Sequence, residues 1–173
     1  MAKSQTFEKY CELAIQLQHV ELEIMSREEK LSFFINIYNT LVIHRHMKMG
    51  SPKNMWQSFF NYVSYLIGKA VFTLQDIENR ILRGNRKGVA QLIRPFSKGD
   101  PRLQIALPDA EPLIHFALNC GAKGCPPIKT YTAKWILNHM GNSPKKKELD
   151  ALLQAASYTL VNLPYDWSTN GKD

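Results

Sequence analysis

The chain has 173 residues, of which 45% are hydrophobic and 21% are charged, and its net charge is +7. A chain of this size buries roughly 70% of the surface that its unfolded form exposes, so its length suits one domain and leaves no room for a second full one. The composition is that of a globular protein, and no apolar run reaches the ~18 residues that a membrane span needs, so we expect no membrane insertion.

The three cysteines of the chain are Cys11, Cys120 and Cys125. An odd number of cysteines does not make a disulfide framework, which fits a reducing compartment. The early apolar segment 13–20 is too polar to be the core of a signal peptide. These features predict a cytoplasmic protein.

Basic residues concentrate between residues 80 and 102, and Lys145–Lys147 form a short run. Aromatic residues are not interleaved with these charges, and no signature of a nucleic-acid module accompanies them. We therefore expect a solvated basic face and no specific nucleic-acid binding, although attraction of anionic partners stays open.

Residues 5–25 carry apolar side chains at steps of three and four, which predicts an amphipathic helix. We expect this N-terminal helix, within residues 1–25, to pack on the next helix as part of the same domain.

The central feature of the sequence is the stretch 26–49. Ser26 and Glu29 have the spacing of a capping box, which predicts that a long helix begins there. Apolar residues surround nearly the whole axis of this helix, so we expect it to be buried.

One polar stripe interrupts the apolar surface of the central helix, at Ser32, Asn36, Asn39 and His46. Asparagines inside a buried helix need hydrogen-bond partners, because each unpaired amide costs roughly 1–3 kcal/mol. The stripe predicts either ties to neighbouring loops or one wall of a functional site.

After a break at Gly50-Ser-Pro, an aromatic-rich segment precedes a predicted hairpin over residues 63–72, in which Gly68 supplies the turn. Thr73 and Asp76 then predict the start of another helix, which ends near Gly84. Residues 85–112 contain four prolines and are expected to form a long ordered loop.

Residues 113–119 are mostly apolar and are predicted to form a central strand of a small sheet. A tight loop, Cys120-Gly-Ala-Lys-Gly-Cys-Pro-Pro, follows. Further helices are predicted from Thr132 to Met140 and over 145–158, and 160–163 is predicted to begin another strand. The fold class is therefore α+β and mainly helical, with the long central helix packed on a small sheet in a single domain over 26–163, followed by an exposed tail over 164–173.

Several motifs resemble those of the domain of unknown function 547. They are Phe33-Phe-Ile-Asn-Ile-Tyr-Asn39, Ile67-Gly68, Thr73-Leu-Gln-Asp-Ile-Glu78, Ile81-Leu-Arg-Gly84, Asp100-Pro-Arg102 and His115-Phe-Ala-Leu-Asn-Cys-Gly-Ala-Lys-Gly-Cys-Pro-Pro127. The resemblance covers about residues 28–160. It implies a domain without an established activity, and we interpret the chain as a protein-interaction or regulatory module with protein partners.

An alternative function is a cysteine-dependent hydrolase or transferase, by analogy with the layout of papain-like and transglutaminase-like enzymes. Such enzymes use a thiolate that an imidazole activates, with a third polar group that orients the ring. Here Cys125 is the candidate nucleophile and His115 the candidate base, while Asn36 or Asn39 is the orienting group or oxyanion donor. In an extended strand His115 and Cys120 face opposite ways, so we expect Cys125 to be the thiol that folds back.

Other interpretations of the same loop stay open. His115 with the two cysteines provides three zinc ligands where a closed site needs four, so no metal and no cofactor is predicted. A reversible disulfide between Cys120 and Cys125 is sterically conceivable, although their spacing is not Cys-x-x-Cys. His115 is otherwise a core histidine. We expect any site to be one pocket lined by Asn36, Asn39, His115 and Cys125, with Cys120, Glu78 and Arg83 of secondary rank.

Overall fold

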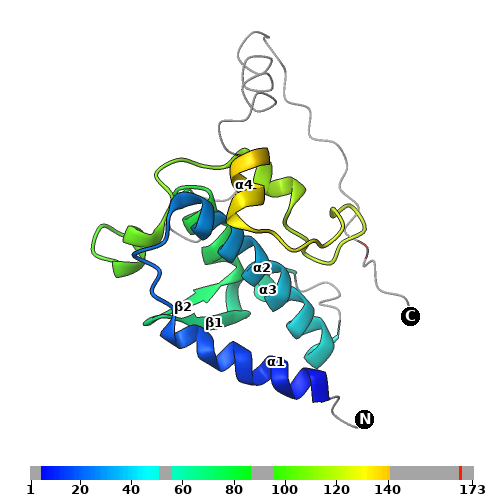
Figure 1. The fold of residues 1–173 in the computed structure, drawn as a ribbon. Coiled ribbons are helices and arrows are strands. Elements are labelled where there is room, and N and C mark those ends of the chain that lie inside the picture. Colours follow the sequence, from blue (N-terminus) through cyan, green and yellow to red (C-terminus); the bar gives the residue numbers. More distant parts are fainter. Residues whose placement is uncertain (1–4, 51–55, 87–95, 141–167, 169–173) are drawn as a thin grey trace.

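A computed structural model describes residues 5–50, 56–86, 96–140 and 168 of the chain. The described residues form a mainly helical α+β fold with one small antiparallel sheet, as the sequence predicts (Figure 1). In chain order the elements are α1 (Gln5–Gln16), η1 (Leu17–His19), α2 (Arg27–Met49), α3 (Trp56–Tyr62), β1 (Ser64–Ile67), β2 (Ala70–Thr73), η2 (Asp76–Leu82), η3 (Pro101–Ile105), η4 (Pro112–Phe116) and α4 (Ala133–His139).

Helix α2 runs through the middle of the molecule (Figure 1). The predicted capping box is present at its start, where the Ser26 side chain accepts from the Glu29 amide and the Glu29 carboxylate accepts from the Ser26 amide. Its first half is buried on several sides, including Phe34 and Ile35, which are fully inaccessible to solvent. This confirms the prediction of a buried central helix.

Helix α1 packs on α2 through aromatic contacts, in which the rings of Phe7 and Tyr10 meet the edge or face of His44. The helix is shorter than the predicted segment 5–25, because the chain tightens into η1 and then becomes extended at Val20. The main-chain oxygen of Leu17 accepts from the Val20 amide, which closes the turn of η1, and also from the Gly68 amide of the hairpin.

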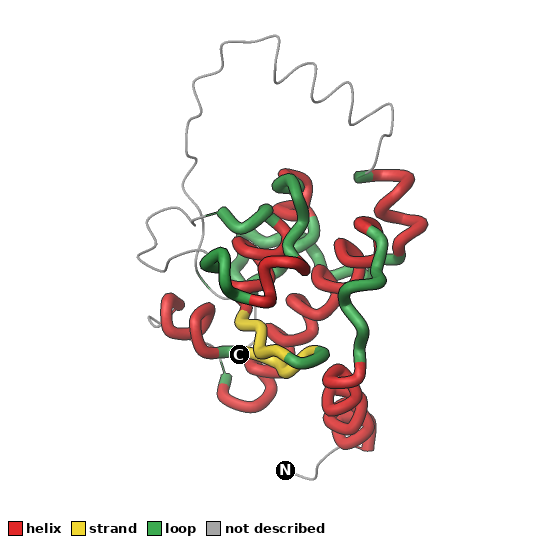
Figure 2. Tube along the Cα trace, turned by 90° about the vertical axis from the view of Figure 1, so that its left-hand side faces the viewer, coloured by secondary structure: helices red, strands yellow, loops and turns green. Residues whose placement is uncertain are grey.

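The sheet is the hairpin of β1 and β2, which is the only strand pair among the described residues (Figure 2). Ile67 pairs with Ala70 across the turn. Gly68 has φ of +58°, the left-handed conformation that side chains disfavour, which confirms its predicted role in the turn.

The predicted helix after Thr73 is also present, and its capping pair joins Thr73 and Asp76 in both directions. Most of this helix, η2, is wound as a π-helix rather than an α-helix. Gly84 follows its end with φ of +63°. The predicted loop over 85–112 is described at residues 85–86 and from residue 96 onward. It contains η3, which begins at Pro101, and the Asp100 side chain caps it by accepting from the Arg102 amide.

The predicted central strand over 113–119 is wrong. Residues Pro112–Phe116 form the 3₁₀ helix η4, in which Pro112 begins the first turn and the Glu111 carboxylate accepts from the Leu113 amide. Pro at the first turn and an acidic cap favour a helical turn, whereas an apolar run of this length does not distinguish a strand from a buried helical segment.

Thr132 caps α4 through the Trp135 amide, as predicted, and α4 packs on α2. The predicted helix over 145–158 and the predicted strand over 160–163 lie outside the described residues, as does the tail apart from Ser168. No helix in the described part of the chain is both long and apolar enough to cross a membrane.

Candidate functional site

Two asparagines of α2 hold loops that are distant in sequence. The Asn36 side chain binds both main-chain groups of Tyr131, donating to its oxygen at 2.8 Å and accepting from its nitrogen at 3.0 Å. The Asn39 side chain donates to the Ala117 oxygen at 2.9 Å and accepts from the Asn119 nitrogen at 2.8 Å. The two asparagines of the polar stripe therefore tie loops to the central helix. In each of them the side-chain nitrogen donates one hydrogen bond and the side-chain oxygen accepts one.

Asn119 extends this network into the segment 119–126, which we call the thiol loop. The side-chain amide of Asn119 donates to the Pro126 oxygen at 2.7 Å and accepts from the Gly121 nitrogen at 2.8 Å. Gly121 has φ of +95°, and a Cβ at this position would lie 2.9 Å from Cε1 of His46. The loop therefore requires glycine here, because both the conformation and the nearby ring exclude a side chain.

The thiol loop places its two cysteines in contact. The Sγ atoms of Cys120 and Cys125 are 3.2 Å apart, and the Cys120 amide donates to Sγ of Cys125, also at 3.2 Å. Cys120 is buried and Cys125 is half-buried, so Cys125 is the more accessible thiol of the pair. The Cys120 amide therefore holds Sγ of Cys125 beside Sγ of Cys120.

Both thiols line a pocket of about 310 Å³, together with groups from α2, η2 and η4. Tyr38 contributes from α2, Glu78 from η2 and His115 from η4. His115 is an exposed member of this lining, while the Tyr38 hydroxyl donates to the Glu78 carboxylate at 3.2 Å. One pocket thus gathers two thiols, a carboxyl group, a phenol and an imidazole.

The electrostatic environment of the pocket shifts the pKa values of Glu78, Tyr38 and His115. Burial raises the pKa of the Glu78 carboxyl, and the adjacent Cys125 raises it further, while the Tyr38 hydrogen bond and the Arg83 charge oppose the rise. Burial and the nearby Glu78 raise the pKa of Tyr38 well above its usual range. Partial burial and the Arg83 charge lower the pKa of His115, which keeps its imidazole neutral and able to accept a proton at neutral pH.

The structure therefore brings together four of the candidate residues, namely Cys120, Cys125, His115 and Glu78. Asn36 and Asn39 do not line this pocket; they act on the loops instead. Arg83 acts on the pocket through its charge, while its guanidinium donates to Asn79 at 2.9 Å.

The expectation that His115 and Cys120 face opposite ways depended on the strand and is wrong, since residues 112–116 form η4 and both side chains line the same pocket. Sequence reasoning also missed Tyr38 and Asn119. Tyr38 lies between the two asparagines of α2, and Asn119 directly precedes Cys120. Their positions next to candidate residues could have indicated that both belong to the site.

In the described part of the chain, no group of three or more histidine, cysteine or acidic side chains is arranged to hold a metal ion. The pocket chemistry that these residues can support is that of thiols and proton transfer.

A known protein family matches most of the chain. The family described as "Protein of unknown function, DUF547" matches residues 22–146, which is well over half of the chain and includes both asparagines, η4 and the thiol loop. No curated protein and no solved structure matches the chain.

Proposed function

The chain belongs to the DUF547 family of proteins of unknown function, and we propose that it is a redox-responsive regulatory module in which Cys120 and Cys125 form a reversible disulfide. The observation that carries this proposal is the 3.2 Å separation of the two Sγ atoms. A disulfide bond is about 2.05 Å long, so closure needs a movement of only about 1 Å. In the cytoplasm, where we place the protein, the dithiol is the resting form and an oxidant produces the disulfide.

Cys125 is the thiol that reacts first in this scheme, because it is more accessible than Cys120 and its sulfur accepts a hydrogen bond from the Cys120 amide. With glutathione disulfide as oxidant, the Cys125 thiolate attacks one glutathione sulfur and releases one glutathione thiolate. The Cys120 thiolate then attacks Sγ of Cys125 and releases the second glutathione. The two protein thiols lose two electrons and two protons overall, and one glutathione disulfide becomes two glutathione thiols.

The regulated output in this proposal is the binding of a protein partner at the pocket mouth. Phe116, the residue after His115 in η4, is 73% exposed and offers a large apolar surface. Closing the disulfide changes the loop that forms one wall of the same pocket, so the partner would bind the two redox forms differently.

The test uses the full chain with Cys11→Ser, so that only the pocket thiols remain. Equilibration with mixtures of reduced and oxidised glutathione is expected to give a species lighter by two hydrogen atoms, detected by mass spectrometry. Cys120→Ser and Cys125→Ser, each in the same background, are the matched controls and should give at most a glutathione adduct. Persistence of two free thiols in mixtures that oxidise a peptide of residues 117–128 would contradict the proposal.

A second candidate function is a cysteine-dependent acyl hydrolase or transferase, which is favoured by the presence of His115 and Cys125 in one pocket. In this scheme His115 takes the Cys125 proton, the thiolate bonds to the acyl carbon, and the leaving group departs with the proton from the imidazolium. Water or another acceptor, which gives its proton to His115, then takes the acyl group, and the Cys125 sulfur leaves as the thiol after regaining that proton. Asn36 and Asn39 would contribute only by holding the loops.

The two proposed functions can be distinguished because only disulfide formation requires Cys120. Release of nitrophenol from p-nitrophenyl acetate should be lost in Cys125→Ser and reduced in His115→Gln, but kept in Cys120→Ser, if the pocket transfers acyl groups. Disulfide formation requires both cysteines and does not require His115. Acetate ester turnover that is equal in Cys125→Ser and the parent chain rules out the second function.

A further inference from the structure

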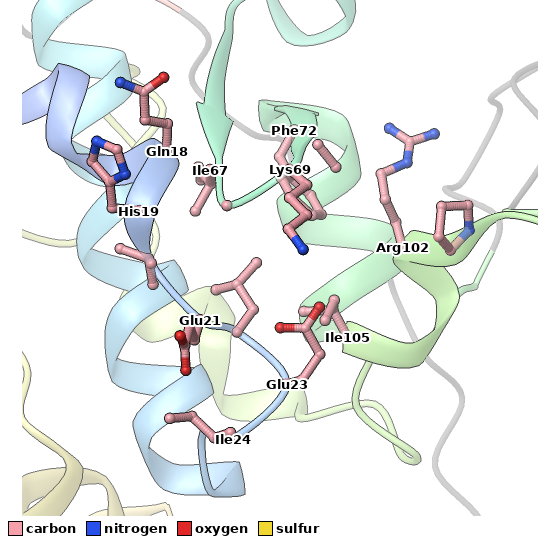
Figure 3. Close-up of a pocket in the computed structure, with 15 residues that line it drawn as sticks. Gln18, His19, Glu21, Glu23, Ile24, Ile67, Lys69, Phe72, Arg102 and Ile105 are labelled. Atoms are coloured by element: carbon pink, nitrogen blue, oxygen red, sulfur yellow. The ribbon is translucent and has the colours of Figure 1, made fainter.

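A second cavity, of about 520 Å³, lies on a different part of the molecule. It shares no lining residue with the 310 Å³ pocket that Cys120 and Cys125 line, which we call the thiol pocket. It is bounded by residues 18–24, by the turn of the hairpin and by the first turn of η3 (Figure 3). This volume is within the range of about 300–1,000 Å³ that is typical of small-molecule sites.

The floor of this cavity is apolar. Four side chains that are each at most 4% exposed form it, namely Leu22, Ile67, Phe72 and Ile105. Such a floor favours a ligand with an aliphatic or aromatic side chain, because burying that side chain removes apolar surface from water.

The walls of the cavity are held in place by hydrogen bonds. The Gly68 amide donates to the Leu17 oxygen at 2.8 Å, and a Cβ on Gly68 would lie 2.9 Å from the Val20 oxygen, so the turn and the segment after η1 are in close contact. Arg102 fastens η3 to β2 by donating to the Val71 oxygen at 2.9 Å, and it also donates to Asp100 and Asp76. The cavity is therefore preformed, which lowers the cost of ordering it around a ligand.

Charged side chains of opposite sign stand on opposite sides of the opening. Lys69 projects from the hairpin, and Glu21 and Glu23 come from the segment after η1 (Figure 3). The Lys69 ammonium and the Glu23 carboxylate are turned toward each other across the cavity, whereas the Arg102 guanidinium points away from its middle (Figure 3). None of the ion pairs among the described residues, which reach up to 4.0 Å, includes Lys69, Glu21 or Glu23.

We propose that this cavity binds a short zwitterionic peptide of apolar residues, with the size of a dipeptide. Its side chains would lie on the floor, its carboxylate at Lys69 and its amino group at Glu23 and Glu21. Two extended residues span about 7 Å, which separates the two ligand charges enough to reach opposite walls. A free amino acid carries both charges on one carbon and fits this separation less well. The inference is independent of the thiol pocket and of its proposed function.

The test measures binding of leucyl-leucine to the full chain by calorimetry and by NMR of methyl groups. Three blocked ligands accompany it, namely the N-acetyl form, the C-terminal amide and the form blocked at both ends, and free leucine serves as a size control. Contacts to exposed charges are individually weak, so blocking either end is expected to raise the Kd by about two- to fivefold. Methyl signals of Leu22, Ile67 and Ile105 should shift on binding.

Variants assign each end of the ligand to a wall. In Lys69→Met the C-terminal amide should bind as well as leucyl-leucine, while N-acetylation should still weaken binding. The double variant Glu21→Gln and Glu23→Gln should show the converse pattern. Lys48→Met on α2 and Glu8→Gln on α1 remove exposed charges elsewhere and should leave all ratios unchanged.

Three results would overturn the proposal. The first is the absence of methyl shifts at leucyl-leucine concentrations near the solubility limit. The second is equal affinity for all four dipeptide forms, which would mean that the charges play no part. The third is tighter binding of free leucine than of leucyl-leucine.

Discussion

Asn36 and Asn39 each satisfy two main-chain groups of a loop that lies far away in sequence. Replacing either residue by leucine leaves those groups unpaired at a cost of roughly 1–3 kcal/mol, even though apolar volume increases. We expect Asn36→Leu and Asn39→Leu each to lower the free energy of unfolding by about that amount in urea titrations. Lys48→Leu, at an exposed position of α2, is the matched control and should change stability little; equal midpoints in all three variants would contradict the prediction.

His44 is a second residue whose environment has a measurable consequence. Its Nδ1 is 2.7 Å from the Tyr65 hydroxyl, and its Nε2 is buried without a hydrogen-bond partner among the described residues. Burial and the charge of Lys48 lower the pKa of the imidazole, so the folded state favours the neutral ring. A depressed pKa means that stability is fully present above the usual pKa of about 6.5 and is lost as pH falls through the folded value.

We therefore expect the urea concentration at the denaturation midpoint to decrease when the pH is lowered from 7.5 to 5. This decrease should be smaller in His44→Gln than in the parent chain. His139→Gln, at an exposed histidine of α4, should leave the pH dependence as it is. Parallel curves for His44→Gln and the parent chain would show that His44 does not contribute to this loss.

Among the elements, the hairpin depends on one glycine for both its turn and its contact with the segment after η1. In Gly68→Ala the new Cβ would occupy a left-handed conformation and approach the Val20 oxygen to 2.9 Å. The conformation alone costs about 1–2 kcal/mol, and relief of the close contact would separate the turn from that segment. We expect a lower thermal midpoint and loss of protection of the Gly68-position amide in hydrogen exchange.

Gly99→Ala is the control for this substitution, because Gly99 has an ordinary φ and nothing within 4 Å of its Cβ position. It should leave stability unchanged or raise it slightly, by about 0.4–1 kcal/mol. Equal losses in the two variants would mean that the turn conformation is not what Gly68 provides.

At the scale of the whole molecule, the number of basic residues between 80 and 102 overstates the basic surface available to a polyanion. Arg80 is only 5% exposed and pairs with Asp76, and Arg102 pairs with Asp76 and Asp100 while lying over the ring of Phe96. We expect weak binding to duplex DNA at low salt, seen by fluorescence anisotropy, that disappears at about 0.15 M salt because released counterions drive it. Selective binding of one sequence that survives this salt would contradict the prediction.

The sequence by itself determined the elements whose signals are local. The capping pairs Ser26–Glu29 and Thr73–Asp76 and the turn glycine Gly68 act within a few residues, so each could be predicted before any tertiary contact was known. The buried helix α2 and the family could also be recognised, because apolar periodicity and ordered motifs are properties of the chain alone.

Only the tertiary structure decided how the candidate site is assembled. An apolar run such as 113–119 is compatible with a strand and with a buried helical turn alike. Residues 112–116 form η4, and His115 lines the same pocket as the cysteines. The roles of Asn36 and Asn39 followed from which loops reach them, and those loops are about 80 and 95 positions away. Contacts over such separations depend on the packing of the whole domain, which periodicity and spacing do not specify.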